Sequence, residues 1–312
     1  MTGETSKRKR LKLGKLQYTI GRSNQPTMSI KPDESIVVET EDAFVGMIKK
    51  RGDWKDSKIP WSNPLSGPIY VEGAEKGDTL IVEIECIKPL IGQGATRLNP
   101  DHLVSVMNPM QLLDVEIPRR VWICPIRDGK VYWTEDFPLP YQPMIGTIGT
   151  APEVESTMEA GPHGGNMDLP DLTTGNTLYL PVFVEGALLH IGDAHAVQGD
   201  GELCGTAVEM PAEVSLTVGL IKNKTIGWPR IESADYIMAV GSRRPLEEAV
   251  RIAFRELIQW LHSEYGFDRM DAYNLCTQVA RIRVGYYLTT IAAKFPKKNL
   301  TKNPRTKASY EV

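Results

Sequence analysis

The pattern between about residue 15 and residue 240 constrains the fold most strongly. Short runs rich in Val, Ile, Leu and Thr alternate there with Gly, Pro, Asp and Asn. Runs this short are typical of strands, and the residues that separate them are typical of turns. The clearest runs are Ile36–Glu39, Thr79–Glu85, Val121–Cys124, Tyr179–Val184 and Ala212–Val218. Many short strands joined by turns predict a sandwich or a barrel.

The last part of the chain has a different period. From Pro245 to Tyr265 the apolar residues recur at helical spacing, and Gly266 suits a helix C-terminus. A second helix is expected from Asp271 to about Ile282. The chain is therefore expected to be mainly β with a C-terminal α+β portion. Its expected parts are a basic tail at 1–14, a β-rich catalytic region at 15–240, an α+β portion at 241–294 and a basic tail at 295–312.

A short motif occurs twice in the β-rich region. Val71–Ala74 and Val184–Ala187 both read Val-Glu-Gly-Ala, and a Gly-Asp pair follows each, at Gly77–Asp78 and Gly192–Asp193. Each copy also follows a strand-like run. The repeated motif indicates two related β units, which predicts an internal duplication.

Composition excludes several classes of protein. The net charge of −3 argues against a nucleic-acid or membrane-surface role for the whole chain. No apolar run approaches the roughly 20 residues of a membrane-spanning helix, and no apolar region of a secretory signal follows the basic N-terminal residues. The four cysteines are far apart, without a C-x-x-C pair, which favours free thiols in a reducing cytoplasm.

Residues that can carry chemistry gather in two segments, Gly161–Asp168 and His190–Glu209. Three of the five histidines of the chain lie there, and they are accompanied by several carboxylates. Glycines in both segments allow sharp turns and close approach of the backbone to a ligand. The candidate site is therefore expected to be built largely from residues 160–210.

Asp193 and His195 are two residues apart, so on an extended strand their side chains project from one face. A carboxylate and an imidazole at one point can hold a divalent cation, Zn²⁺ first of all and Ca²⁺ as an alternative. His163 is expected to supply a third ligand and Asp42 a fourth. The competing interpretation is that these residues form hydrogen-bonded turns without a metal.

Cys204 offers a second chemistry, because a thiolate can attack an amide carbon. The competing interpretation is a small packed residue. Phosphate-binding, dinucleotide-binding, nucleophile-elbow and H-E-x-x-H motifs are absent from the sequence, so nothing supports a nucleotide cofactor.

At these residues the sequence resembles the acetamidase/formamidase family. The matching stretches are Glu39–Ala43, Asn63–Ala74, Gly77–Leu80, Gly161–Asp168 and Gly192–Glu202. The resemblance implies hydrolysis of formamide, acetamide or related short amides, a fold with a jelly-roll-like part, a metal near the Asp/His segments and homo-oligomers. One departure is Gly146-Thr-Ile-Gly149, where relatives commonly have Gly-x-Met-Gly.

The expected mechanism is attack by metal-activated water. Glu202 or Glu209 is expected to carry the proton to the leaving nitrogen, and Asn166, Asp168 and Gln198 are expected to bind the substrate. The alternatives are a cysteine amidase that uses Cys204, a relative that acts on lactams, and a non-catalytic β protein that binds a cation or small ligand.

Overall fold

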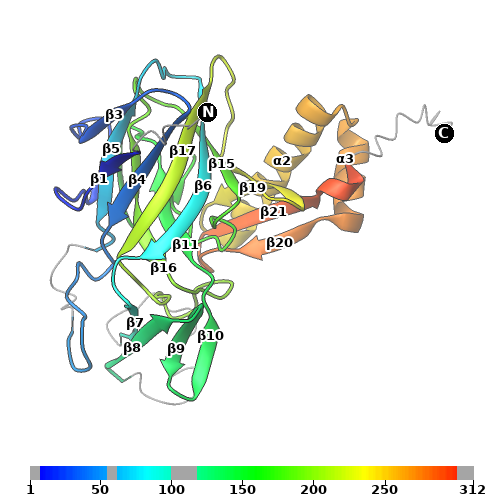
Figure 1. Ribbon diagram of the computed structural model, residues 1–312. Coiled ribbons are helices and arrows are strands. Elements are labelled where there is room, and N and C mark those ends of the chain that lie inside the picture. The colour runs from blue at the N-terminus through cyan, green and yellow to red at the C-terminus, as the bar shows by residue number, and fades with distance from the viewer. Residues whose placement is uncertain (1–7, 55–61, 100–117, 301–312) are drawn as a thin grey trace, which may run out of the picture.

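The computed structural model describes residues 8–54, 62–99 and 118–300, and it is mainly β (Figure 1). Two large sheets pack face to face. The nine-stranded sheet has the order β1 (Lys9–Leu11), β4 (Glu34–Thr40), β17 (Ala212–Ile221), β6 (Thr79–Pro89), β15 (Thr177–Pro181), β18 (Arg230–Glu232), β19 (Tyr236–Ser242), β21 (Thr290–Pro296) and β20 (Arg281–Val284). The six-stranded sheet has the order β13 (Ala160–Gly161), β14 (Gly164–Asn166), β11 (Met144–Gly149), β16 (Leu189–His195), β5 (Leu65–Val71) and β3 (Met28–Ile30).

Two smaller sheets complete the β region. A four-stranded sheet lies at one end of the sandwich in Figure 1, with the order β10 (Phe137–Pro140), β9 (Lys130–Thr134), β8 (Arg120–Arg127) and β7 (Gln93–Leu98). A two-stranded sheet joins β12 (Val154–Ser156) to β2 (Thr19–Gly21). The predicted sandwich is thus confirmed.

The main core lies between the two large sheets. Leu80, Val82 and Ile84 of β6 alternate toward it from the nine-stranded sheet, and Ile145 and Ile148 of β11 enter it from the other. Each such side chain stabilises the fold by about 1.5–3 kcal/mol when it is fully buried. This core fixes β11 and β16, the two strands that support the candidate site.

All five strand-like runs identified in the sequence lie on strands, β4, β6, β8, β15 and β17. The fourth run was expected to continue to Val184, but β15 ends at Pro181. Val182 instead donates its backbone N–H to the carbonyl of Asp78, at 3.0 Å, in a connection to the first Val-Glu-Gly-Ala copy.

The two Val-Glu-Gly-Ala copies lie against each other. The N–H of Val71 donates to the carbonyl of Gly186 at 2.9 Å, and the N–H of Gly186 donates to the carbonyl of Ala74 at 2.8 Å. Gly73 and Gly186 have matching left-handed φ values of 76° and 74°. The strand before each copy pairs with the strand after the other, β5 with β16 and β15 with β6. This reciprocal pairing is what a duplicated unit would produce.

The C-terminal portion extends the nine-stranded sheet and adds two helices, α2 (Leu246–Tyr265) and α3 (Arg269–Val279), followed by a 3₁₀ turn at Lys297–Asn299. Helix α2 packs on β19 and β21 and ends at Gly266, as predicted (Figure 1). Helix α3 begins after Asp268, which accepts hydrogen bonds from the N–H groups of Met270 and Asp271. No helix among the residues that the structure describes is long and apolar enough to cross a membrane.

The second helix ends earlier than the sequence predicted. Ile282 lies on β20, where it pairs with Ala293 of β21, because sheet pairing replaces the helix after Val279.

Both tails are shorter than predicted. Lys9–Leu11 form β1 beside β4, because Lys9 pairs with Glu34 and Arg10 with Glu39 and Glu213. At the other end, Phe295 belongs to β21 and is fully buried. Residues 1–7 and 301–312 lie outside the described part of the chain.

Candidate functional site

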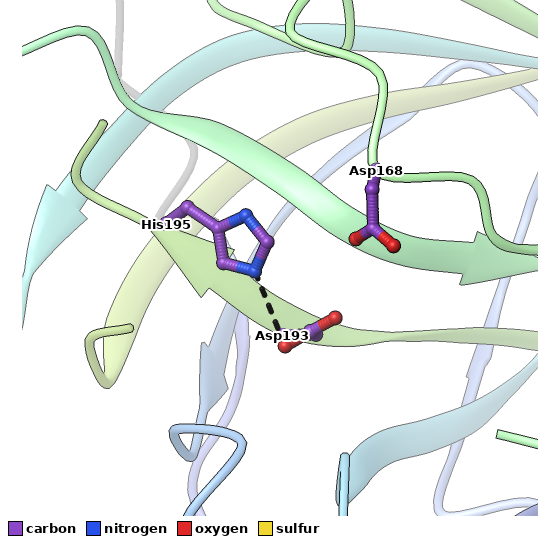
Figure 2. A group of neighbouring side chains, drawn as sticks. All are labelled: Asp168, Asp193 and His195. Atoms are coloured by element: carbon purple, nitrogen blue, oxygen red, sulfur yellow. Dashed lines mark hydrogen bonds and ion pairs between the residues drawn. The ribbon is translucent and has the colours of Figure 1, made fainter. Parts of the chain in front are cut away.

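Five titratable side chains meet at the end of β16, and we call them the acid cluster: Asp168, Asp193, His195, Glu202 and Glu209. Asp193 and His195 lie on β16, Asp168 follows β14, and Glu209 pairs in isolated bridges with Ala95 and His195. Figure 2 shows Asp168 facing the Asp193 and His195 side chains from a separate segment. Four members are at most 2% exposed, and Glu202 is partly exposed.

The backbone of the acid cluster is unusual. Asp168, Asp193 and Glu202 have left-handed φ values of 50°, 56° and 47°. Such a conformation costs a non-glycine residue on the order of 1 kcal/mol, and it persists where the surrounding structure enforces it. Three of the four carboxylates in the cluster are therefore aimed by locally strained backbone, a pattern found at functional sites.

Gly146 of β11 provides the space that these carboxylates occupy. A Cβ atom at this position would lie 2.6 Å from Oδ2 of Asp193 and 2.8 Å from Oδ1 of Asp168. The carbonyl of Gly146 also accepts the N–H groups of Met167 and Asp168, at 3.0 and 3.1 Å. The first glycine of the Gly146–Gly149 stretch is thus part of the floor of the site.

Hydrogen bonds fix the tautomer of His195. Gln198 donates its Nε2 to the backbone carbonyl of Asp168 at 2.6 Å, so its Oε1 is the atom 2.9 Å from Nδ1 of His195. Because Oε1 only accepts, Nδ1 carries a hydrogen. In the neutral ring the lone pair is then on Nε2, which lies 3.3 Å from Oδ1 of Asp193 and 3.1 Å from Oε2 of Glu209. That arrangement is stable only with a proton or a cation at Nε2.

Burial and mutual electrostatic interactions raise the pKa values of several groups in the acid cluster. Burial, and then the nearby Asp193, raises the pKa of Asp168 well above its usual range. Burial and Asp168 do the same to the pKa of Glu202, and burial also raises the pKa of Glu209. Burial works against a charged His195, but Glu209 and Asp193 outweigh it and raise the pKa of the imidazole well above 6.5.

Three neutral side chains support the cluster. Asn63 donates its amide to Oδ2 of Asp193 at 3.1 Å and to Oδ1 of Asn166 at 3.0 Å. The hydroxyl of Thr147 lies 3.0 Å from the same Asp193 oxygen, and Asn166 donates to Oδ2 of Asp168 at 2.9 Å. Asn63 and Thr147 were not predicted as site residues. Neither residue type signals a site by itself, although Asn63 belongs to a stretch that resembles the family.

The cluster has the donor atoms that a divalent cation requires. Asp168, Asp193 and His195 offer ligand atoms within 4.8 Å of one another, and so do His195, Glu202 and Glu209. Among the described residues, Oδ1 of Asp168 is a buried carboxylate oxygen without a hydrogen-bond partner, whereas Oε2 of Glu209 lies 3.1 Å from Nε2 of His195. Buried unpartnered carboxylate oxygens are costly unless a cation compensates them. The residues present therefore fit a metal ion.

Two predicted ligands lie outside these groups. The backbone carbonyl of His163 accepts the N–H of Thr150 at 3.0 Å, so this residue sits at the far end of β11 from Gly146. Burial lowers the pKa of His163 to about 4. Asp42 closes its own turn, where Oδ1 accepts the N–H groups of Phe44 and Gly46 at 2.8 and 3.1 Å.

Asp42 should make the fold less stable as the pH rises. Burial, which outweighs the two backbone donors, raises its pKa from 3.8 to about 7. The folded chain then binds a proton more tightly than the unfolded chain, so stability falls between about pH 4 and pH 7, by up to roughly 4 kcal/mol. We expect Asp42→Asn to flatten this fall in urea unfolding of chelator-treated protein. Equal pH dependence in both proteins would contradict this role.

Cys204, the predicted alternative nucleophile, is exposed. Its thiol donates to the backbone carbonyl of Thr206 at 3.3 Å. It belongs to neither of the groups that could hold a metal.

A cavity of about 1130 Å³ lies elsewhere, lined by residues 49–54, 119–123, 133 and 134. Its lining is mostly basic and aromatic, and it includes no member of the acid cluster. We place the site at the acid cluster, because buried carboxylates and an imidazole with perturbed pKa values mark functional sites.

Known proteins are similar to this chain in sequence and in fold. The acetamidase of Mycolicibacterium smegmatis is 29% identical over 256 residues, which cover 62% of this chain and 63% of that protein. The formamidase of Methylophilus methylotrophus is 28% identical over 249 residues, with 62% and 61% covered. The chain thus spans about three fifths of the length of these curated relatives.

A crystal structure of acetamidase from Yersinia enterocolitica superimposes with a TM-score of 0.88 at 39% identity, covering 96% of this chain and 94% of that one. The model of the Acetamidase/Formamidase family matches residues 23–156 and 147–285, which include the whole acid cluster. These matches cover most of the chain and agree with the resemblance seen in the sequence. The chain belongs to the acetamidase/formamidase family.

Proposed function

We propose that this chain hydrolyses short-chain carboxamides, of the formamide and acetamide type, to ammonia and a carboxylate. Relatives named acetamidase and formamidase support the reaction class. The observation that carries the proposal is the position of Nε2 of His195, 3.3 Å from Asp193 and 3.1 Å from Glu209, where a proton or a cation must lie. That geometry suits a cation-dependent hydrolase better than a binding protein. Glu202, a carboxyl group whose pKa is raised by burial, lies beside the proposed ligands, where a hydrolase needs a group that transfers protons.

We propose that Asp168, Asp193 and His195 would hold the cation, since these three side chains are buried and offer ligand atoms within 4.8 Å of one another. This set replaces Asp42 and His163 by Asp168. An imidazole ligand favours Zn²⁺ over Ca²⁺, which prefers oxygen ligands alone. Zn²⁺ lowers the pKa of a bound water to about 7 and polarises a carbonyl oxygen.

Glu202 is the proposed proton carrier. Hydrolysis delivers the oxygen of water to the carbonyl carbon and a proton to the departing nitrogen, so one group must accept the proton and release it. Burial raises the pKa of Glu202 well above its usual range, which favours a carboxyl group that can hold and release a proton, and the residue remains partly exposed to an arriving substrate. Glu209 is less suited, because Oε1 accepts the N–H of Ala207 at 2.9 Å and Oε2 faces His195.

Asn166 and Gln198 were expected to bind substrate, but their amide groups are engaged with neighbours. Asn166 orients Asp168, and Gln198 orients His195. We propose that both act on the substrate only through these residues. Asp168 was itself predicted to bind substrate and is proposed here as a ligand. A proposed ligand that is oriented in this way holds its geometry before the substrate binds.

A substrate panel tests the reaction class. Purified protein should release ammonia from formamide, acetamide and propionamide and should leave peptides nearly untouched, and lactams are included as the alternative substrate class. Ammonia is measured by a coupled assay, and denatured protein serves as the blank. Cleavage of peptides or lactams without ammonia from short amides would reject the proposal.

We further propose a cytoplasmic homo-oligomer whose only other partner is the small amide. All four cysteines are free, which suits a reducing compartment. The nine-stranded sheet ends in β1 and β20, and exposed edge strands are often covered between subunits. Light scattering should give a multiple of the chain mass at micromolar concentration, and the mass of a single chain would contradict the assembly.

A further inference from the structure

The two loops that supply Asp168 and Glu202 are tied together by a residue of the C-terminal portion. We propose that Arg283 of β20 is a positioning residue of the amidase site, which fixes the position of these two loops relative to each other. The proposal rests on the proposed function and adds to it that the C-terminal hairpin completes the site. No motif in the sequence pointed to this residue.

The contacts of Arg283 reach both loops. Its Nε donates to Oδ2 of Asp171 at 3.1 Å, and its Nη1 donates to Oδ1 of Asp200 at 2.5 Å. Asp171 lies three residues after Asp168, and Asp200 lies two residues before Glu202. One planar guanidinium group therefore links the segments that carry a proposed ligand and the proposed proton carrier.

The backbone of the hairpin between β20 and β21 reinforces the link. Gly201 donates its N–H to the carbonyl of Val284 at 3.1 Å and accepts the N–H of Tyr287 at 2.9 Å. On the other loop, a Cβ atom at Gly285 would lie 2.3 Å from the carbonyl of Met167. The hairpin thus contacts both site loops directly, and Arg283 supplies the charged part of that contact.

The role of Arg283 is geometric more than stabilising. Asp171 is 8% exposed and keeps a second partner, since Lys294 donates to its Oδ1 at 2.6 Å. Loss of Arg283 therefore leaves no buried charge without a partner. Asp200 has a side chain that is 50% exposed, and ion pairs of that kind contribute little to stability. The fold should survive the substitution while the relative position of the loops relaxes.

Residues that orient ligands and catalytic groups typically contribute 10–100-fold to activity or to metal affinity. We expect Arg283→Ala to lower kcat for acetamide about 10–100-fold, because Asp168 and Glu202 are no longer held for the reaction. KM should change less than about threefold, because the pair holds catalytic groups and makes no contact with a small neutral amide.

The experiment compares the full-length wild type with Arg283→Ala, Arg283→Lys and Asp200→Asn. Arg251→Ala is the matched control, an arginine of the same portion whose ion pair with Glu248 is on the outer surface of α2. Lysine keeps the positive charge but cannot donate to Asp171 and Asp200 at once as the planar guanidinium group does, so it should restore activity only in part. Millimolar guanidinium ion should partly rescue Arg283→Ala and have no such effect on the control.

A titration with Zn²⁺ of chelator-treated protein separates this proposal from the proposed function. If the wild type releases no ammonia from short amides, the proposed function fails, and the titration still decides whether Arg283 positions Asp168. Weaker Zn²⁺ binding in folded Arg283→Ala supports the positioning role. Unchanged kcat and unchanged Zn²⁺ affinity would overturn it, and if that variant does not fold, the same outcome in Asp200→Asn does so.

Discussion

His195→Ala should lose the bound metal and the amidase activity together. The imidazole supplies the only nitrogen ligand of the proposed set, and Gln198 holds its Nε2 toward Asp193 and Glu209. Without it, the buried carboxylates of Asp168, Asp193 and Glu209 and the partly exposed Glu202 face one another, and a cation is held less well at neutral pH. We expect kcat to fall by more than about a hundredfold, beyond the loss typical of residues that only orient a ligand.

Elemental analysis and ammonia release on the same sample measure both quantities. His262→Ala is the control, because His262 lies in the last turn of α2 and contacts the carbonyl of Phe267. The control should keep its metal and its activity. Retention of a full complement of metal by inactive His195→Ala would make His195 a catalytic group and not a ligand.

Gly146→Ala is expected to cause the second large loss, from a single methyl group. The new Cβ would overlap Oδ2 of Asp193 and Oδ1 of Asp168, at 2.6 and 2.8 Å, and so move two proposed ligands at once. The φ of Gly146 is not in the left-handed region, so alanine can adopt its backbone. We expect a fall in kcat of at least about tenfold. The Cβ would also lie 2.8 Å from the backbone carbonyl oxygen of Asp193, so the melting temperature should fall as well, and kcat is compared below it.

Gly92→Ala is the matched control, since its Cβ would meet a single carbonyl oxygen at an ordinary distance of 3.7 Å. It should retain wild-type kinetics and metal content. If Gly146→Ala is as active as this control, the two carboxylates can move freely without loss of function, and the proposed ligand geometry is wrong.

Local sequence was sufficient for most of the fold. Short apolar runs such as Ala212–Val218 became strands because they pair within a buried sheet, and the 3.6-residue period after Pro245 became α2. Local pattern failed where tertiary pairing decided the outcome. Ile282 was predicted in a helix but pairs in β20, and Lys9 was predicted in a tail but pairs in β1.

The candidate site could likewise be predicted only in part from local sequence. Asp193 and His195 were predicted from their spacing on an extended strand. The structure places Oδ1 and Nε2 of the pair 3.3 Å apart, although Asp193 has a left-handed φ of 56° and not an extended backbone. The choice between His163 and Asp168 depended on register. His163 pairs near Gly149, whereas Asp168 lies at Gly146, and three residues along a strand separate the two positions by about 10 Å.

The positioning residues could not be inferred from local pattern at all. Arg283 is one of many surface-type arginines in the sequence, and its role arises only because β20 docks beside the two site loops. Asn63 likewise reaches Asp193 across 130 positions of sequence. Contacts of this range depend on the packing of whole sheets, which the alternation of apolar residues in one strand does not encode.

The most direct test of a cation-dependent amidase site is one measurement on the wild type: ammonia release from acetamide before and after dialysis against chelator, with metal content determined on the same samples. We predict about one ion per chain before dialysis, loss of activity with loss of that ion, and recovery when Zn²⁺ is restored. Full activity in protein that retains no stoichiometric metal after dialysis would contradict the account.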